Sequence, residues 1–130
     1  MPFSSYCEPL GQKPASWWWH ALKDEVEERP YGAFPGIWKD YTGPIKKNGE
    51  NVSQRVFVFM TCDANGLESA QHHGRMPVLL DTDEQFDTWL HGTEEDALAL
   101  AMPYPDDRMR IVQKGSARKD MLGEEGGMAH

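Results

Sequence analysis

The sequence predicts one β-rich domain of the α+β class, and three observations support this prediction. A chain of 130 residues is long enough for one domain and too short for two ordinary ones. Short runs of β-branched and aromatic residues recur between turn residues, as they do in strands. Helix signals are confined to residues 64–71 and 82–102. We expect the domain to occupy residues 1–113, followed by a flexible, glycine-rich tail at 114–130.

The chain opens with irregular sequence and an aromatic strand. Residues 1–15 contain three prolines and a glycine, which is typical of irregular structure or of a short strand and a loop. Residues 16–22 (SWWWHAL) fit a strand. Trp17 and Trp19 would face one side of it and Trp18 the other, so both faces should be covered.

Three segments in the middle of the chain have strand character. Residues 31–38 are interrupted by glycine and by Pro35, which indicates an edge strand or a bulge. A polar loop is expected over residues 39–54. Residues 55–61 (RVFVFMT) are mostly β-branched or aromatic and are predicted to form a strand buried on both faces. Residues 76–80 (MPVLL) are apolar enough for another strand.

The clearest helix begins after residue 82. Thr82 is a typical N-cap, and Gln85 three residues later completes a capping box. The apolar residues of this helix fall on one face at i, i+3 and i+4: Phe86, Trp89 and Leu90.

The remaining elements are short. Gly92 is placed to end the helix, and Thr93 to cap a second helix through Met102. Residues 64–71 can form a short helix, and residues 108–112 are the last strand candidate.

The charge balance is unfavourable for a nucleic-acid-binding protein. The chain has 21 acidic and 13 basic residues and a formal net charge of −8. It could hold DNA only if its basic residues gather on one face. One local basic cluster exists, and it either contacts phosphates or forms a solvated hairpin tip: Lys39, Lys46, Lys47 and Arg55. The three tryptophans at 17–19 could stack on bases, but alternating strand side chains more often belong to the core.

The cysteines and histidines bear on compartment and cofactors. Cys7 and Cys62 have no C-x-x-C spacing, which predicts a reducing compartment and no disulfide framework. No long apolar run and no signal peptide are visible, so we expect a cytoplasmic protein without a membrane partner. Five histidines without cysteine pairs show no metal-ligand spacing, so we expect no metal and no other cofactor.

The segment from His72 to Pro77 (HHGRMP) is the most suggestive candidate site. Histidine titrates near neutral pH and can move a proton, and Arg75 presents a planar fork to phosphate oxygens. The alternative is a surface loop whose histidines only hydrogen-bond the backbone. The segment by itself leaves both interpretations open.

Several segments together resemble the SOS response-associated peptidase (SRAP) family. Its motifs occur here in the family's order: Phe34-Pro35-Gly36-Ile37-Trp38, a strand from Val56 to Thr61, Ala64-Asn65, and His73-Gly74-Arg75-Met76-Pro77-Val78. Upstream, Pro2 to Glu8 is similar to a family segment in which a glutamate follows a proline. The resemblance runs from Pro2 to about Val112.

The resemblance implies a function on damaged DNA. Proteins of this family crosslink themselves to abasic sites in single-stranded DNA through an N-terminal cysteine, whose amine and thiol capture the sugar aldehyde, and some show autopeptidase activity. By position, Glu8 and His73 match the catalytic glutamate and histidine, which handle protons, so we expect both side chains to line the same cleft. Arg75 matches an arginine that contacts the DNA backbone, and we assign Trp38 and Lys39 to DNA contact as well.

The chain departs from the family at the nucleophile. Residue 2 is Pro2, Cys7 falls in the glutamate segment, and Pro9 replaces a tryptophan common after the glutamate. We therefore expect the C-terminal portion of the domain, N-terminally truncated, inactive by itself, and homo-oligomeric because a truncated sheet exposes edges. Three alternatives stay open: an abasic-site enzyme whose other part is lost through the reading frame, a non-catalytic remnant, and a small-molecule or protein-binding domain. A further variant is that removal of Met1 exposes the Pro2 amine, which then forms an iminium ion with the aldehyde.

Overall fold

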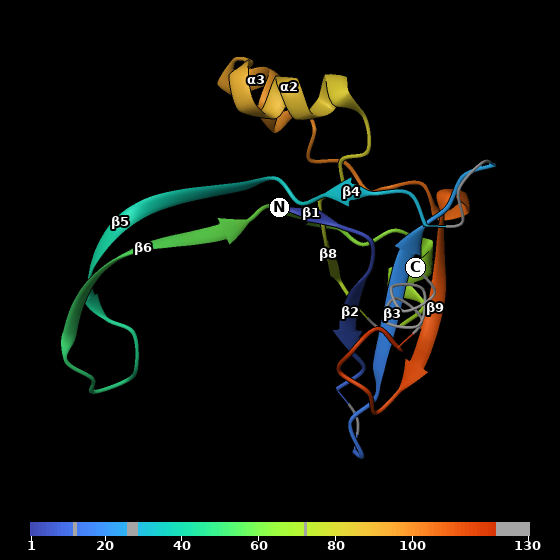
Figure 1. Cartoon of the computed structure of the whole chain (residues 1–130), viewed down its shortest axis with the longest axis horizontal. Coiled ribbons are helices and arrows are strands. Elements are labelled where there is room, and N and C mark those ends of the chain that lie inside the picture. The colour runs from blue at the N-terminus through green and yellow to red at the C-terminus, as the bar shows by residue number, and fades with distance from the viewer. Residues whose placement is uncertain (12, 26–28, 72, 122–130) are drawn as a thin grey trace, which may run out of the picture.

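The computed structural model describes residues 1–11, 13–25, 29–71 and 73–121 and confirms a strand-rich fold of the α+β class (Figure 1). In chain order the elements are β1 (Pro2–Phe3), β2 (Tyr6–Pro9), β3 (Trp17–Leu22), β4 (Gly32–Ala33), β5 (Gly36–Pro44), β6 (Asn51–Phe59), β7 (Thr61–Asp63), α1 (Gly66–Ser69), β8 (Arg75–Pro77), α2 (Asp83–His91), α3 (Glu94–Leu98), the 3-10 turn η1 (Asp106–Arg108) and β9 (Met109–Gly115).

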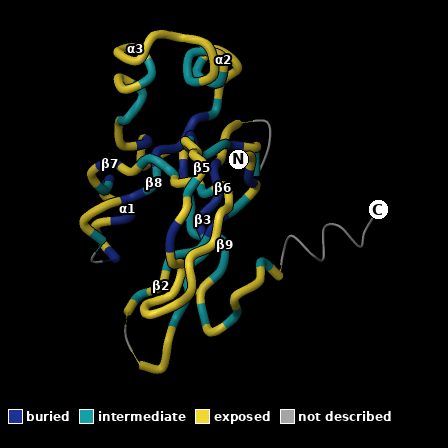
Figure 2. The backbone as a smooth tube through the Cα atoms, turned by 90° about the vertical axis from the view of Figure 1, so that its left-hand side faces the viewer, coloured by how far each residue is buried: buried dark blue, intermediate teal, exposed yellow. Residues whose placement is uncertain are grey.

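A three-stranded antiparallel sheet, β2-β3-β9, forms the centre of the body. Smaller pairs, β1-β4 and β7-β8, lie beside it, and an isolated bridge between Ala33 and Leu80 ties β4 to the segment after β8. The core lies between these pieces, and its most buried apolar side chains are Leu22, Met76, Val78 and Leu80. In Figure 2 the buried backbone lies in the body below helices α2 and α3, which are exposed or intermediate.

Strands β5 and β6 form a long two-stranded arm, residues 36–59, that projects from the body (Figure 1). Its register runs without a break from Gly36 opposite Phe59 to Pro44 opposite Asn51. The polar loop expected over residues 39–54 is therefore wrong, because only the turn between the two strands is irregular. Polar residues predominate over 39–54, which suits a ribbon exposed to water on both faces.

The expectation that residues 55–61 are buried on both faces is also wrong. Phe57 is 64% exposed and Val58 is 59% exposed, although they point to opposite faces of β6. Their apolar character indicated a central strand, whereas among the described strands β6 pairs with β5 alone. Composition alone cannot distinguish a central strand from a strand in a free ribbon.

The predicted N-caps of helices α2 and α3 are confirmed, whereas the apolar face predicted for α2 is buried only in part. Thr82 and Gln85 make the capping box of α2 as predicted, and Thr93 caps α3, which ends at Leu98 and not at Met102. Phe86 and Trp89 pack against the core. Leu90 does not, since it is 71% exposed. Each of the described helices is too short or too polar to cross a membrane.

The C-terminal strand is longer than expected. β9 continues to Gly115 and so crosses the boundary placed at residue 113. The segment after it folds back on the strand: Gln113 Nε2 donates to the Lys119 carbonyl at 2.7 Å, and the Met121 N–H donates to Gln113 Oε1 at 2.9 Å. Residues 122–130 of the expected tail lie outside the described residues.

Candidate functional site

Glu8 and His73 meet in the body of the molecule although 65 positions separate them in the sequence. His73 Nε2 lies 3.6 Å from Glu8 Oε2, and each side chain is about one-fifth exposed. Glu8 is held by β2, where it lies opposite Trp18 of β3. His73 lies in the short segment between α1 and β8. The predicted proximity of these two residues is confirmed.

Hydrogen bonds of Ala64 and Asn65 fix the position of the segment that contains His73. Asn65 caps α1: its Oδ1 accepts from the Glu68 N–H at 3.0 Å, and its Nδ2 donates to the Tyr104 carbonyl at 2.6 Å. The Ala64 N–H donates to the Gly74 carbonyl at 3.3 Å. The His73 N–H in turn donates to the Glu68 carbonyl at 3.4 Å. The cap and these backbone bonds hold His73 beside β2.

A buried polar network lies directly behind the pair, and sequence reasoning missed it. Tyr6 donates its hydroxyl to Glu68 Oε1 at 2.7 Å, and His20 Nε2 lies 3.8 Å from the same oxygen. Gln71 Nε2 lies 2.8 Å from His20 Nε2, and the Tyr6 ring stacks on His20 with centroids 5.1 Å apart. Glu68 and His20 are both 0% exposed.

A signal for part of this network exists in the sequence. In antiparallel β2 and β3, Tyr6 pairs with His20 and Glu8 pairs with Trp18, so the four side chains share one face of the sheet. Period-two alternation along Tyr6-Cys7-Glu8 and along Trp18-Trp19-His20 predicts that grouping once the pairing is known. No comparable sequence pattern predicts that Glu68 joins this group.

Burial and neighbouring charge shift the protonation equilibria of the network. Burial, and secondly the nearby Glu68 carboxylate, raise the pKa of Glu8 to about 7. Burial lowers the pKa of His20, and burial together with Glu68 raises the pKa of Tyr6. At neutral pH the Glu8 carboxyl is therefore present in both its protonated and its ionised form. A side chain with such a pKa can both donate and accept a proton.

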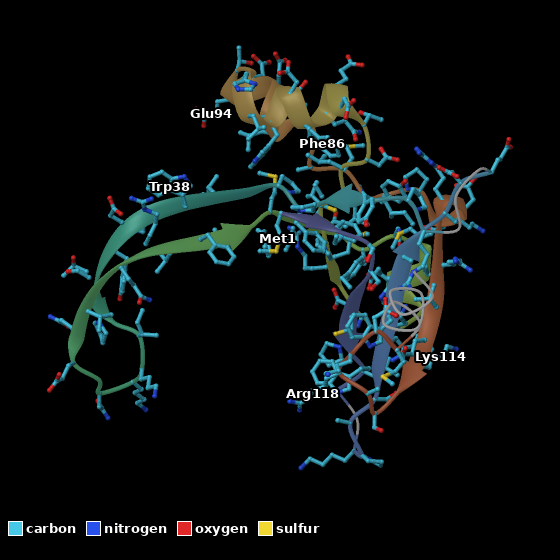
Figure 3. All side chains as sticks on the ribbon, viewed as in Figure 1. Met1, Trp38, Phe86, Glu94, Lys114 and Arg118 are labelled. Carbon is cyan, nitrogen blue, oxygen red and sulfur yellow. The ribbon has the colours of Figure 1, made fainter. Side chains whose placement is uncertain are left out.

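The proposed DNA-contact residues lie on two different elements, Arg75 on β8 two residues after His73, and Trp38 and Lys39 on β5. Arg75 donates to Asp63 Oδ1 at 3.0 Å and to the Thr61 carbonyl at 2.9 Å, along the β7-β8 pair. Trp38 and Lys39 lie on the β5-β6 arm, and Figure 3 shows Trp38 apart from the sheet that carries Glu8. The Arg55 guanidinium lies 4.4 Å from the Trp38 ring centre, which is a cation–π contact.

A surface groove of about 660 Å³ is a separate feature of the described residues. It lies between the base of the arm and helices α2 and α3, and its apolar lining includes Ile37, Trp38, Trp89, Leu90 and Leu98. None of the titratable cluster around Glu8 lines it. The size of the groove favours it as a binding surface. The groups suited to acid–base chemistry are those of the Glu8–His73 pair.

Replacing Tyr6 with phenylalanine should destabilise the fold, because the buried Glu68 carboxylate then loses its hydroxyl donor. We expect the free energy of unfolding to fall by about 1.5–3 kcal/mol. Chemical denaturation followed by tryptophan fluorescence measures it. Tyr41→Phe is the matched control, since it removes an exposed hydroxyl bond to the Pro44 carbonyl and should cost about 0.5 kcal/mol or less. Equal losses in both variants would contradict the role given to the Tyr6–Glu68 bond.

Comparison with known proteins assigns the chain to a family. Residues 2–117 match the family described as SOS response associated peptidase (SRAP). A search of curated proteins gave no match. That the chain represents the C-terminal portion of the family's domain stays a prediction, since the match begins at residue 2. The match covers most of the 130 residues, and the chain therefore belongs to the SRAP family, which is associated with DNA damage.

Proposed function

We propose that this chain contributes the proton-transfer pair Glu8 and His73 to a reaction on abasic sites in single-stranded DNA, and that it forms no crosslink by itself. The observation that carries the proposal is the 3.6 Å approach of the His73 ring to the Glu8 carboxylate. Opening an abasic sugar to its aldehyde and adding an amine to that aldehyde both require proton transfers. Two groups of this kind within one hydrogen bond, or one water, of the same carbon can make them.

The 130 residues do not contain the nucleophile that such a reaction uses in this family. A thiazolidine ring needs an amine and a thiol on adjacent carbons of one residue. Removal of Met1 would give Pro2 a free secondary amine but no thiol, and the nitrogen of Cys7 is part of a peptide bond. Cys7 also points to the face of β2 opposite Glu8, because neighbouring strand residues alternate.

Incubation with a single-stranded oligonucleotide carrying one abasic site should therefore give no heat-stable adduct on a denaturing gel. Glu8 and His73 can assist proton transfer, but they cannot replace an absent nucleophile. A heat-stable adduct that forms without reductant and is lost in Cys7→Ala would contradict this expectation. An adduct that appears only after borohydride reduction would instead identify an amine as the nucleophile, as the Pro2 alternative requires.

The arm is our proposed contact surface for the DNA strand. It carries four basic and two acidic residues, in a chain with a formal net charge of −8. Trp38 is 62% exposed on it, and Lys39 follows directly. Exposed aromatic rings beside basic side chains bind unpaired nucleotides by stacking and by phosphate contacts.

Trp38→Ala should weaken binding of an abasic single-stranded oligonucleotide, measured by fluorescence anisotropy at low salt. Stacking contributes about 1–3 kcal/mol per base, which corresponds to a roughly 5- to 150-fold rise in Kd. Tyr31→Ala is the control, because Tyr31 is 73% exposed but lies outside the arm. If both variants bind as tightly as the unmodified chain, the arm is not the contact surface.

We also propose that the chain self-associates through the arm. A two-stranded ribbon is marginally stable by itself, and its outer edges offer unpaired backbone groups to another strand. Ile37 and Val58 lie opposite each other on one face of the arm and are 63% and 59% exposed. A second copy that covers this face would bury apolar surface that water now reaches.

Multi-angle light scattering over a range of protein concentrations should show a dimer or larger species. Replacing both Ile37 and Val58 with serine should shift the population to the monomer, because it removes the apolar side chains that the second copy covers. The Met102→Ser variant, which changes an exposed apolar residue beyond the end of α3 and away from the arm, should leave the distribution unchanged. A strict monomer at high concentration would refute self-association.

A further inference from the structure

We propose that Glu8, Glu68 and His73 form a binding site for a divalent first-row metal ion, with Zn²⁺ as the natural probe. One donor atom from each of the three side chains lies within 4.8 Å of the donor atoms of the other two. The proposal does not rest on the proposed action on abasic DNA. It concerns what the cluster binds, whichever reaction the protein carries out.

The spacing suits a tetrahedral ion. Ligand atoms about 2.0–2.1 Å from Zn²⁺ lie roughly 3.3 Å from one another in tetrahedral geometry. The His73 Nε2 to Glu8 Oε2 distance is 3.6 Å, longer than a hydrogen bond and close to that value. The donor atom of Glu68 lies within 4.8 Å of one donor atom of each of these residues, so ion binding requires the three side chains to move closer together.

The second observation is an unpartnered carboxylate oxygen. Glu68 is 0% exposed, and its Oε2 atom is buried without a hydrogen-bond partner. His73 Nε2 is likewise buried without a hydrogen-bond partner. Leaving such atoms unsatisfied is costly in a protein interior, and a metal ion bound between them would satisfy both.

Hydrogen bonds and contacts from neighbouring residues fix the orientation of the Glu68 carboxyl group. Tyr6 binds Oε1 at 2.7 Å, which leaves Oε2 as the free atom. His20 contacts the same Oε1 atom at 3.8 Å and is held in turn by Gln71. Hydrogen bonds of this outer kind orient the ligands of metal sites and raise their affinity.

Three protein ligands leave one position for water or a substrate. This arrangement is typical of catalytic zinc sites, whereas structural sites use four protein ligands. Glu8 and His73 are each about one-fifth exposed, so solvent can reach the cluster from their side. A bound ion would occupy the atoms that Glu8 and His73 need for proton transfer, so metal binding and the proposed proton transfer exclude each other.

The sequence expectation of no metal came from the spacing of cysteines and histidines. The three ligands come from β2, from α1 and from the segment before β8, so no short motif contains them. Only the fold brings them together.

The test is a titration of the full chain with Zn²⁺ at neutral pH, in competition with a chromogenic chelator and without DNA. We expect one ion per chain. The variants Glu68→Gln and His73→Gln should each weaken binding about 100-fold or more, since loss of an outer partner already costs about 10- to 100-fold. His91→Gln is the control: His91 pairs with Asp87 at 3.0 Å on the surface of α2 and should not matter.

No binding, or binding that neither Glu68→Gln nor His73→Gln weakens, would overturn the proposal. Circular dichroism first shows whether each variant is folded. If Glu68→Gln does not fold, His73→Gln decides the question, because His73 lies between secondary-structure elements and is partly exposed. Because the titration contains no DNA, its outcome is independent of whether an adduct forms on abasic DNA.

Discussion

The buried carboxylate of Glu68 is the constraint on which the site depends. It accepts a hydrogen bond from Tyr6 on β2 and contacts His20 on β3, while its own backbone binds Asn65 and His73. Burying a carboxyl group is costly unless hydrogen bonds such as these compensate for the lost contact with water. Two strands, a helix and the histidine segment therefore have to pack in one arrangement. That arrangement places Glu8 and His73 side by side.

The body and the arm divide the apolar residues between them. The body encloses Leu22, Met76, Val78 and Leu80 almost completely, whereas the arm exposes aromatic and aliphatic side chains on both faces. A ribbon with such faces is stabilised only weakly by its own contacts. Both proposed partners of the arm, a DNA strand and a second copy of the chain, would cover it.

The sequence predicted local features better than burial. The capping box at Thr82 and Gln85 depends on neighbouring residues alone, and it is present. Burial of Phe57 and Leu90 depends on what packs against them, which periodicity does not contain. The pairing of Glu8 with His73 came from a family resemblance, and the buried Glu68 could not be predicted at all. Its position follows from the short α1 helix and from Asn65, both of which place it through tertiary contacts.

The distribution of charge resolves the conflict between a net charge of −8 and a DNA partner. Residues 82–98, which contain α2 and α3, carry six acidic residues and no lysine or arginine, whereas the arm carries an excess of basic residues. The groove between the arm and these helices is lined by both Trp38 and Glu94. Phosphates would be repelled there, but an uncharged base would not. Lys39 points to the face of β5 opposite Trp38 because neighbouring strand residues alternate. Under the proposed function, a base would therefore stack on Trp38 within the groove while the phosphates follow the Lys39 face of the arm, away from the acidic helices.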